Sequence, residues 1–171
     1  MLFDTPRLTV RPFERADASA VLPFWGDADT VRFLGDGTPW AVDEPSAAEC
    51  ITRTTAYYEA HPGYGFFAVE LKADTSLAGH IALKPLGDDE IEIGWLLDRH
   101  HRGRGIAFEA ATGMLNYGFD TQGLDQIVAV MYHENTASRR VAERLGMAYQ
   151  GTRPEGGSTV AWYRLTRDTF L

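Results

Sequence analysis

The 171-residue sequence has a single cysteine, Cys50, and no long uninterrupted apolar run. One cysteine excludes an intrachain disulfide and a cysteine-based metal site. No apolar stretch approaches the roughly 18 residues that a membrane span requires, and the first residues lack the apolar core of a signal peptide. These absences predict a cytoplasmic protein that does not span or enter a membrane.

Basic residues are in the minority, since 16 Lys and Arg stand against 24 Asp and Glu, a formal net charge of −8. This balance argues against a nucleic-acid partner, which would need a basic face, and favours amine-bearing partners. Arginine is nevertheless concentrated beside glycines in the segment 99–105. That concentration indicates an anion site in an otherwise acidic protein.

The chain contains no internal repeat or low-complexity linker, so we expect a single domain over residues 1–171. Apolar periodicity and turn residues predict strands at 8–12, 66–71, 77–86, 90–97, 126–132, 147–151 and 159–165, and helices at 16–25, 46–60, 105–120 and 136–145. The stretch 26–45 is expected to be an irregular loop over a pocket. Hairpins followed by a β-α-β crossover predict an α+β fold with a mixed, mostly antiparallel sheet of about 6–7 strands flanked by about four helices.

The most informative segment is a strand that runs into a loop with Gly103 and Gly105, directly before a helix. Such a loop directs backbone N–H groups at one point, at the positive end of the helix dipole, and predicts a diphosphate cradle. Arg102 and Arg104 add positive charge beside it. The pattern lacks the third glycine of a Rossmann fingerprint and the Gly-Lys-Ser/Thr of a P-loop.

This loop, His100-His101-Arg102-Gly103-Arg104-Gly105, resembles the acetyl-CoA loop of the GNAT N-acetyltransferase superfamily, with His100 where Gln or Arg is usual. A second region, from Asn135-Thr-Ala-Ser138 to Gly151, resembles the Asn-x-x-Ser…Leu-Gly-Phe…Gly ending of the same superfamily. The opening, Thr5-Pro-Arg7-Leu8 through Asp17-Ala18, resembles the branch of ribosomal-protein N-terminal alanine and serine acetyltransferases.

The resemblance implies a GNAT fold whose fourth and fifth strands splay apart, and direct acetyl transfer from acetyl-CoA to an amine within a ternary complex. It places acetyl-CoA against the main chain at the end of the fourth strand, where a backbone N–H meets the thioester carbonyl, and against the cradle loop and the next helix. The implied cofactor-binding residues are Trp95, Leu96, Leu97, Arg102, Gly103, Arg104, Gly105, Ile106, Ala107, Asn135 and Ser138. No metal is implied, and the five histidines show no ligand spacing.

Two residues are candidates for proton transfer. If Ile91 and Ile93 face the core, the two-residue period of a strand turns Glu92 toward the cleft, where its carboxylate would accept a proton from the amine; the alternative is a solvated face. Ser138 matches a position that protonates the leaving thiolate in the ribosomal-protein branch, and is otherwise a structural hydroxyl. Asn135 is either a cofactor ligand, a helix N-cap, or both.

Three functions remain open at this level. The first is an N-acetyltransferase acting on a protein N-terminal α-amine or a small amine, the second a non-catalytic acyl-CoA-binding module, and the third a nucleotide-binding protein. The stretches 33–40 and 152–158 are expected to shape the acceptor site, and Asp36, Asp43 and Glu44 indicate a cationic acceptor. Both a monomer and a homodimer are compatible with the sequence.

Overall fold

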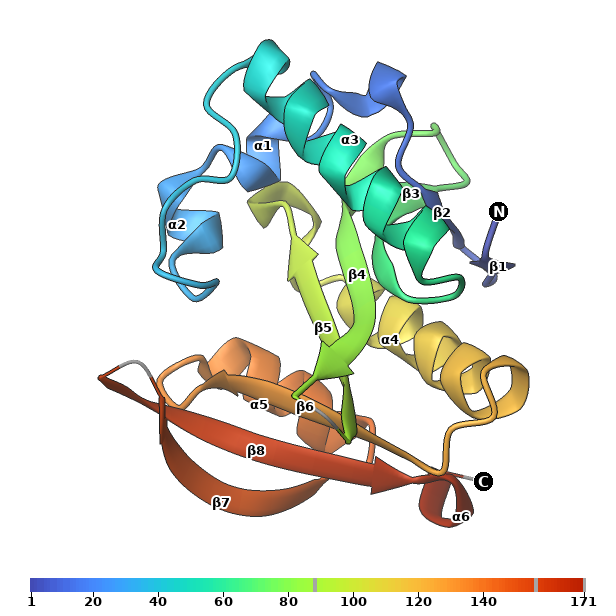
Figure 1. Cartoon of the computed structure of the whole chain (residues 1–171), viewed down its shortest axis with the longest axis vertical. Coiled ribbons are helices and arrows are strands. Elements are labelled where there is room, and N and C mark those ends of the chain that lie inside the picture. Colours follow the sequence, from blue (N-terminus) through green and yellow to red (C-terminus); the bar gives the residue numbers. More distant parts are fainter. Residues whose placement is uncertain (88, 156, 171) are drawn as a thin grey trace.

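The computed structural model describes residues 1–87, 89–155 and 157–170. Eight strands form one sheet in the order β1-β2-β3-β4-β5-β6-β8-β7 (Figure 1). The strands are β1 (Phe3–Asp4), β2 (Leu8–Pro12), β3 (Gly65–Leu71), β4 (Leu77–Leu86), β5 (Glu90–Leu97), β6 (Gln126–Tyr132), β7 (Ala148–Glu155) and β8 (Ser158–Thr166). The helices are α1 (Leu22–Trp25), α2 (Ala28–Val31), α3 (Glu44–Ala60), α4 (Ile106–Asn116), α5 (Thr136–Arg144) and α6 (Arg167–Phe170), with 3-10 turns at Arg15–Asp17 and Arg99–His101 and a π turn at Tyr117–Thr121.

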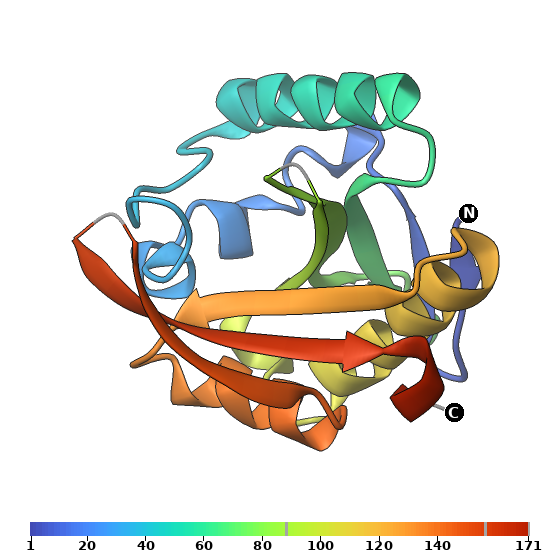
Figure 2. The same cartoon turned by 60° about the horizontal axis from the view of Figure 1, so that its bottom comes forward.

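Helices cover the sheet on both faces, with α3 on one side and α4 and α5 on the other (Figure 2). Strand periodicity divides the core accordingly, because neighbouring side chains point to opposite faces. On β3, Ala68 joins the cluster under α1 and α3, whereas Phe67 and Val69 join the larger cluster under α4. Within the described residues, no helix is both long and apolar enough to cross a membrane.

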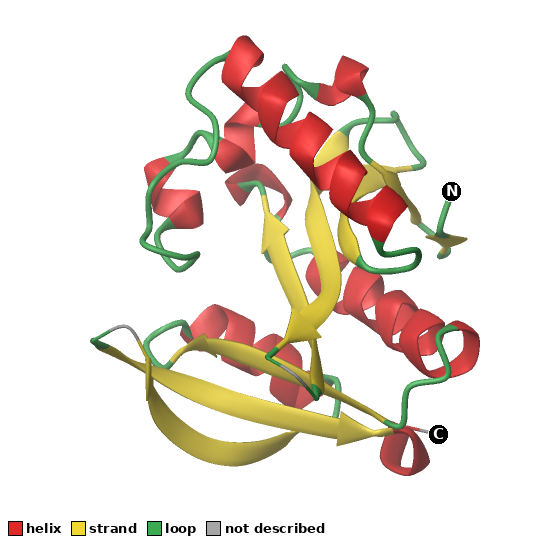
Figure 3. Cartoon of the chain, viewed as in Figure 1, coloured by secondary structure: helices red, strands yellow, loops and turns green. Residues whose placement is uncertain are grey.

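The sheet opens between β5 and β6. These two strands run parallel and pair at one register position, Glu92 with Val128, whereas the other neighbouring strands pair antiparallel. Beyond that position β5 and β6 diverge, and α4 makes the crossover between them (Figures 1 and 3). The predicted α+β class, mixed sheet and splay are therefore confirmed, with eight strands instead of 6–7 because the two-residue β1 gives no periodic signal.

The expected continuous helix at 16–25 is wrong. The chain forms a 3-10 turn at Arg15–Asp17 and then the short α1, with Pro23 in its first turn. A longer helix would place Pro23 in its interior, where the missing N–H breaks the ladder. In the first helical turn the same proline is tolerated, which explains the break.

The helix predicted at 46–60 begins two residues earlier, at Glu44, and a capping box closes its N-terminus. Asp43 is the N-cap and accepts from Ser46 N–H, while Ser46 Oγ accepts from the N–H of Asp43. Pro45 occupies the first turn, where proline is favoured.

A glycine within a strand, such as Gly94, can mark a bulge or a close approach of another group to the backbone. Gly94 pairs regularly with Ala82, and register shifts occur instead at Val69/Glu70 and Tyr149/Thr152. Because Gly94 has no side chain and Ala82 only a methyl group, this part of the sheet surface leaves space for a ligand.

Gly79, by contrast, is required by close packing between β4 and β5. An added Cβ would overlap the carbonyl oxygen of Leu96 and lie 2.8 Å from Leu97 Cα, and backbone atoms of a paired strand cannot move aside. We expect Gly79→Ala to lower the free energy of unfolding by about 3 kcal/mol, measured by urea denaturation. Gly94→Ala is the matched control, because its Cβ would meet only Ala82 Cβ at 3.9 Å; equal losses in both variants would contradict the explanation.

Candidate active site

Two adjoining cavities lie at the splay, with volumes of about 440 and 410 Å³. The first lies against the start of α4 and one side of α5, and the second lies over the face of the sheet on the other side of Trp95. The residues that line both are Phe33, Leu34, Trp95, Asn135 and Ser138. Two molecules bound side by side would therefore meet near Trp95, Asn135 and Ser138.

The start of α4 presents unpaired backbone donors to the first cavity. Gly103 and Gly105 have φ of 74° and 76°, a left-handed conformation that glycine adopts without strain. The first helical bond runs from Glu109 N–H to the carbonyl of Gly105, so the N–H groups of residues 106–108 have no partner inside the helix. No side chain caps them. The loop therefore has the backbone geometry that the sequence predicted, and its role as a diphosphate cradle stays a prediction.

The N-terminal segment holds this loop in place. Arg7 donates from Nη1 to the carbonyl of Arg104, at 3.0 Å, and pairs through Nε with Glu109 Oε2, at 2.6 Å. Thr5 Oγ1 donates to the other oxygen of Glu109. Burial alone would raise the pKa of Glu109, but the bonds from Thr5 and Arg7 outweigh it and hold that pKa below its ordinary value. The Thr5-Pro-Arg7 opening thus has a structural role at the cradle.

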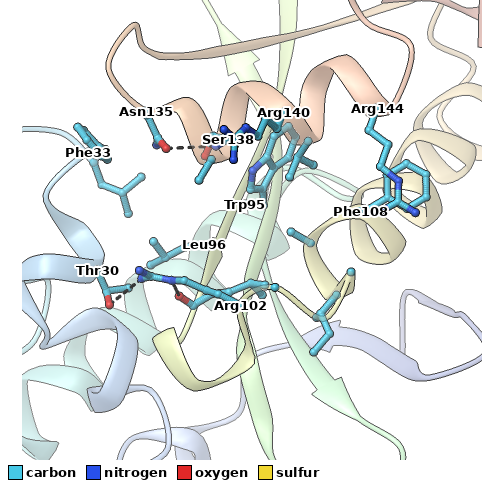
Figure 4. A pocket seen from close by; sticks show the side chains of 18 of the residues that line it. Thr30, Phe33, Trp95, Leu96, Arg102, Phe108, Asn135, Ser138, Arg140 and Arg144 are labelled. Atoms are coloured by element: carbon cyan, nitrogen blue, oxygen red, sulfur yellow. Dashed lines mark hydrogen bonds between the residues drawn. The ribbon is translucent and has the colours of Figure 1, made fainter.

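The two arginines of the loop are placed differently from the expectation. Arg102 lines the first cavity, but its guanidinium donates to Leu97 O, at 3.1 Å, and to Thr30 Oγ1, at 2.9 Å, which ties the loop to α2 (Figure 4). Arg104 is not among the lining residues. The other predicted cofactor-binding residues, Trp95, Leu96, Leu97, Gly103, Gly105, Ile106, Ala107, Asn135 and Ser138, all line this cavity.

Further positive charge reaches the first cavity from α5. Arg139 on α5 donates to Tyr163 Oη at 3.0 Å and to the carbonyl of His133, away from the cavity. Arg140 and Arg144, four residues apart and so on one helix face, line the cavity. Arg144 lies over the Phe108 ring, 4.0 Å from its centroid (Figure 4). The four-residue spacing was the available signal for this pair.

The backbone of β5 faces the same cavity with its open edge. Asp98 N–H donates to Ala78 O on β4. Because successive residues of a strand direct their N–H groups to opposite edges, those of Leu97 and Trp95 point toward β6. The carbonyl of Leu97 accepts from Arg102 on that edge, which agrees with this geometry. The predicted main-chain donors for a thioester carbonyl therefore lie at the splay.

Asn135 and Ser138 form the start of α5, between the two cavities. Asn135 Oδ1 accepts from Ser138 N–H at 3.2 Å, so Asn135 is the N-cap of the helix (Figure 4). Capping uses the amide oxygen and leaves the Nδ2 donors for other partners. The structural role of Asn135 is thus established, and the cofactor role stays a prediction.

The second cavity contains Glu92. Ile93 is buried in the core and Ile91 packs against it, so Glu92 faces the opposite side, as the strand period predicted. Its Oε2 accepts from Lys84 Nζ at 2.5 Å, and the two side chains are 14% and 33% exposed. Lys84 lies directly across the β4–β5 ladder from Glu92. The sequence-based interpretation overlooked Lys84, although an antiparallel pairing of Leu86 with Glu90 also pairs Lys84 with Glu92.

Aromatic side chains form the other end of the second cavity. His80 is 2% exposed, stacks on Trp40 with ring centroids 5.3 Å apart, and meets Phe66 edge-on at 5.4 Å. Trp25 Nε1 donates to His80 Nδ1 at 3.0 Å, so neutral His80 carries its proton on Nε2. Burial lowers the pKa of His80 to about 3. This histidine is therefore an uncharged wall of the cavity at neutral pH.

Burial of neutral His80 predicts a pH-dependent loss of stability. Below pH 6.5 His80 is protonated in the unfolded chain, whereas in the folded chain it is protonated only below about pH 3. The free energy of unfolding therefore decreases as pH falls through this range. Urea unfolding between pH 6.5 and 4.5 should show a wild-type decline steeper than that of His80→Gln by up to about 1.4 kcal/mol per pH unit. Glutamine keeps an acceptor for Trp25 without titrating, so parallel declines in the two proteins would disprove this.

The acids expected to attract a cationic acceptor are used in local structure. Asp36 accepts from Thr38 N–H and Oγ1, and Asp43 caps α3. Neither these two nor Glu44 lines a cavity, whereas the segment 33–40 contributes Phe33, Leu34, Gly35 and Trp40 to the second cavity. Of the described residues in 152–158, none lines either cavity. The described part of the chain contains no group of three or more His, Cys, Asp or Glu side chains that could hold a metal ion.

Known proteins share this architecture and sequence. The model of the family described as Acetyltransferase (GNAT) domain matches residues 7–148. The Uncharacterized N-acetyltransferase YnaD of Bacillus subtilis (strain 168) is 31% identical over 152 residues, which cover 88% of this chain and 85% of that protein. The family match spans the cradle, the splay and the start of α5.

Solved structures agree with these matches. The acetyltransferase (GNAT family) from Bacillus anthracis superposes with a TM-score of 0.82 at 29% identity and covers 96% of this chain and 98% of its own. A RimL ribosomal L7/L12 alpha-N-protein acetyltransferase in complex with coenzyme A reaches a TM-score of 0.82 at 16% identity, with 98% of each chain covered, a likeness of fold alone. The chain therefore belongs to the GNAT acetyltransferase family, and it is an N-acetyltransferase.

Proposed function

We propose that this N-acetyltransferase uses acetyl-CoA as donor and transfers the acetyl group directly to a primary amine, either a protein N-terminal α-amine or a small-molecule amine, within a ternary complex. The observation that carries the proposal is the pair of cavities that share Trp95, Asn135 and Ser138. The donor occupies the first and the acceptor the second, so that thioester and amine meet at the shared wall.

The chemistry of the first cavity fits a coenzyme A thioester. The unpaired N–H groups at the start of α4 suit a diphosphate, and Arg140 and Arg144 supply positive charge nearby. Asn135 Nδ2 is available to the amide groups of the pantetheine arm. The RimL structure of the same fold is itself a complex with coenzyme A.

In the proposed reaction, the acceptor nitrogen attacks the thioester carbonyl carbon, the N–C bond forms and the C–S bond breaks. Glu92 takes the proton from the amine, through water. The N–H groups on the open edge of β5 stabilise the negative charge that develops on the carbonyl oxygen. Ser138 gives a proton to the leaving thiolate, and proton exchange with solvent returns both side chains to their starting states.

A non-catalytic acyl-CoA-binding module would need the first cavity alone. The second cavity is lined by the carboxylate of Glu92 and by Gly94, two residues further along β5. A carboxylate beside the space for an acceptor favours a working enzyme.

A thermal-shift and calorimetric titration with acetyl-CoA, with ATP and NAD as controls, tests the donor. Acetyl-CoA at about 100 times its Kd should stabilise the protein by about 2.7 kcal/mol, with one molecule bound per chain. Release of CoA thiol in the presence of a panel of amines and N-terminal peptides then tests turnover.

Three results are distinguishable. Selective acetyl-CoA binding with amine-dependent thiol release supports the proposal. Binding without release by any amine would favour the binding module. Failure of acetyl-CoA to bind, or equal binding of ATP, would refute the donor assignment.

A further inference from the structure

The charges of the second cavity are balanced. Of the described residues that line it, Lys84 and Glu92 alone carry a formal charge at neutral pH. Their side chains touch each other, one as donor and one as acceptor, while both remain partly accessible. A site with one cation and one anion side by side matches a ligand that carries an anionic and a cationic group on the same carbon atom.

The floor of the cavity places this pair at one end and aromatic rings at the other. Every second side chain of a strand lies on the same face, and on β4 these are His80, Ala82, Lys84 and Leu86. All four line the cavity. Ala82 faces Gly94 across the ladder, between the aromatic end and the charged end. The small residues Ala82 and Gly94 leave room in the middle of the cavity for a small molecule whose amine lies toward Trp95 and the shared wall.

A bridge across the splay covers one side of this space. Tyr132 Oη on β6 donates to the carbonyl of Gly35, at 2.8 Å, and its ring lies 6.0 Å from that of Phe33. The segment after α2 is thereby attached to the far half of the sheet. This attachment narrows the approach for a polypeptide and favours a compact acceptor.

Resting on the proposed function, we infer that the acceptor is a small zwitterionic α-amino acid with an aromatic or large apolar side chain. Its ammonium group is held by Glu92 through water, its carboxylate binds Lys84, and its side chain lies against Trp40, Phe66 and His80. On binding, the ion pair between Lys84 and Glu92 is replaced by one interaction of Glu92 with the ammonium group and one of Lys84 with the carboxylate. A peptide N-terminus brings the amine but has no carboxylate on the same carbon.

Matched acceptors test this inference in the full-length protein with acetyl-CoA. We expect kcat/KM for L-phenylalanine to exceed that for L-phenylalaninamide at least tenfold, and glycine to be acetylated poorly because it leaves the aromatic end empty. Lys84→Met should reduce the ratio of kcat/KM for the acid to kcat/KM for the amide at least tenfold, because its effect on Glu92 acts on both acceptors alike while the lost carboxylate contact acts on the acid only. A merely structural role of Lys84 would lower both equally.

Two variants serve as controls. Lys84→Arg keeps the positive charge and should keep the preference for the acid. Lys72→Met removes a lysine that pairs with Asp4 outside the cavities and should behave as wild type. Acetyl-CoA binding by calorimetry confirms that each variant is folded.

The outcomes separate this inference from the function on which it rests. Failure of acetyl-CoA to bind would sink the proposed function itself. Acetyl-CoA binding with equal turnover of acid and amide, with better turnover of an N-terminal peptide, or with no turnover of either amino-acid derivative would overturn the zwitterionic acceptor alone.

Discussion

Gly103→Glu is expected to weaken acetyl-CoA binding at least 100-fold, measured by calorimetric titration. Gly103 lines the first cavity, where the proposed diphosphate lies, and an added Cβ would meet no protein atom within 4 Å, so the chain leaves open space for the new carboxylate beside that cavity. A carboxylate about 4 Å from a phosphate costs about 1 kcal/mol in water and about 4 kcal/mol near a protein surface. Exclusion of the diphosphate from the N–H groups of α4 adds to this.

Gly123→Glu is the matched control for this experiment. Gly123 has φ of 72°, almost the same as the 74° of Gly103, and it too has no atom within 4 Å of an added Cβ. The two variants therefore carry the same backbone strain and the same added charge, but Gly123 lies outside both cavities. Equal acetyl-CoA affinity in both variants would show that the Gly103 loop is not the cradle.

Much of the fold was predictable from the sequence because its strands have clear ends. The predicted bounds of β4, β5 and β6 match the structure, since the apolar or alternating runs there are bounded by polar and turn residues. The N-terminal helices were not predictable in the same way. Helical periodicity at 16–25 persisted across Pro23, and only the backbone donor that proline lacks decides where the helix breaks.

The candidate site was predictable where backbone carries the function and less so where side-chain direction does. Glycines before a helix are enough to predict a loop whose backbone N–H groups converge. The choice of Arg140 over Arg139 depends on the rotation of α5 about its axis against β8, where Tyr163 fixes Arg139. His80 is kept neutral by burial and accepts a bond from Trp25, 55 residues away, and no local pattern predicts that contact.

Glu92→Gln should lower kcat for acetyl transfer by about 100- to 10,000-fold, the range typical of a lost general base. Glutamine has the same shape but accepts no proton at neutral pH. Acetyl-CoA affinity should stay unchanged, because Glu92 lines the second cavity and not the first. Steady-state kinetics with saturating acetyl-CoA and a varied amine, together with calorimetry, measure both quantities.

Glu90→Gln provides the comparison within the same strand. Glu90 lies two residues before Glu92, is partly exposed, and pairs with Arg164 at 2.8 Å, but lines neither cavity. Its variant should keep kcat within about twofold, because a partly exposed ion pair contributes little to stability and none of its atoms faces the amine. The split between kcat and KM then decides the role of Glu92. A raised KM with unchanged kcat would make Glu92 an amine-binding group that takes no proton, whereas a fall in kcat at unchanged acetyl-CoA affinity identifies the base.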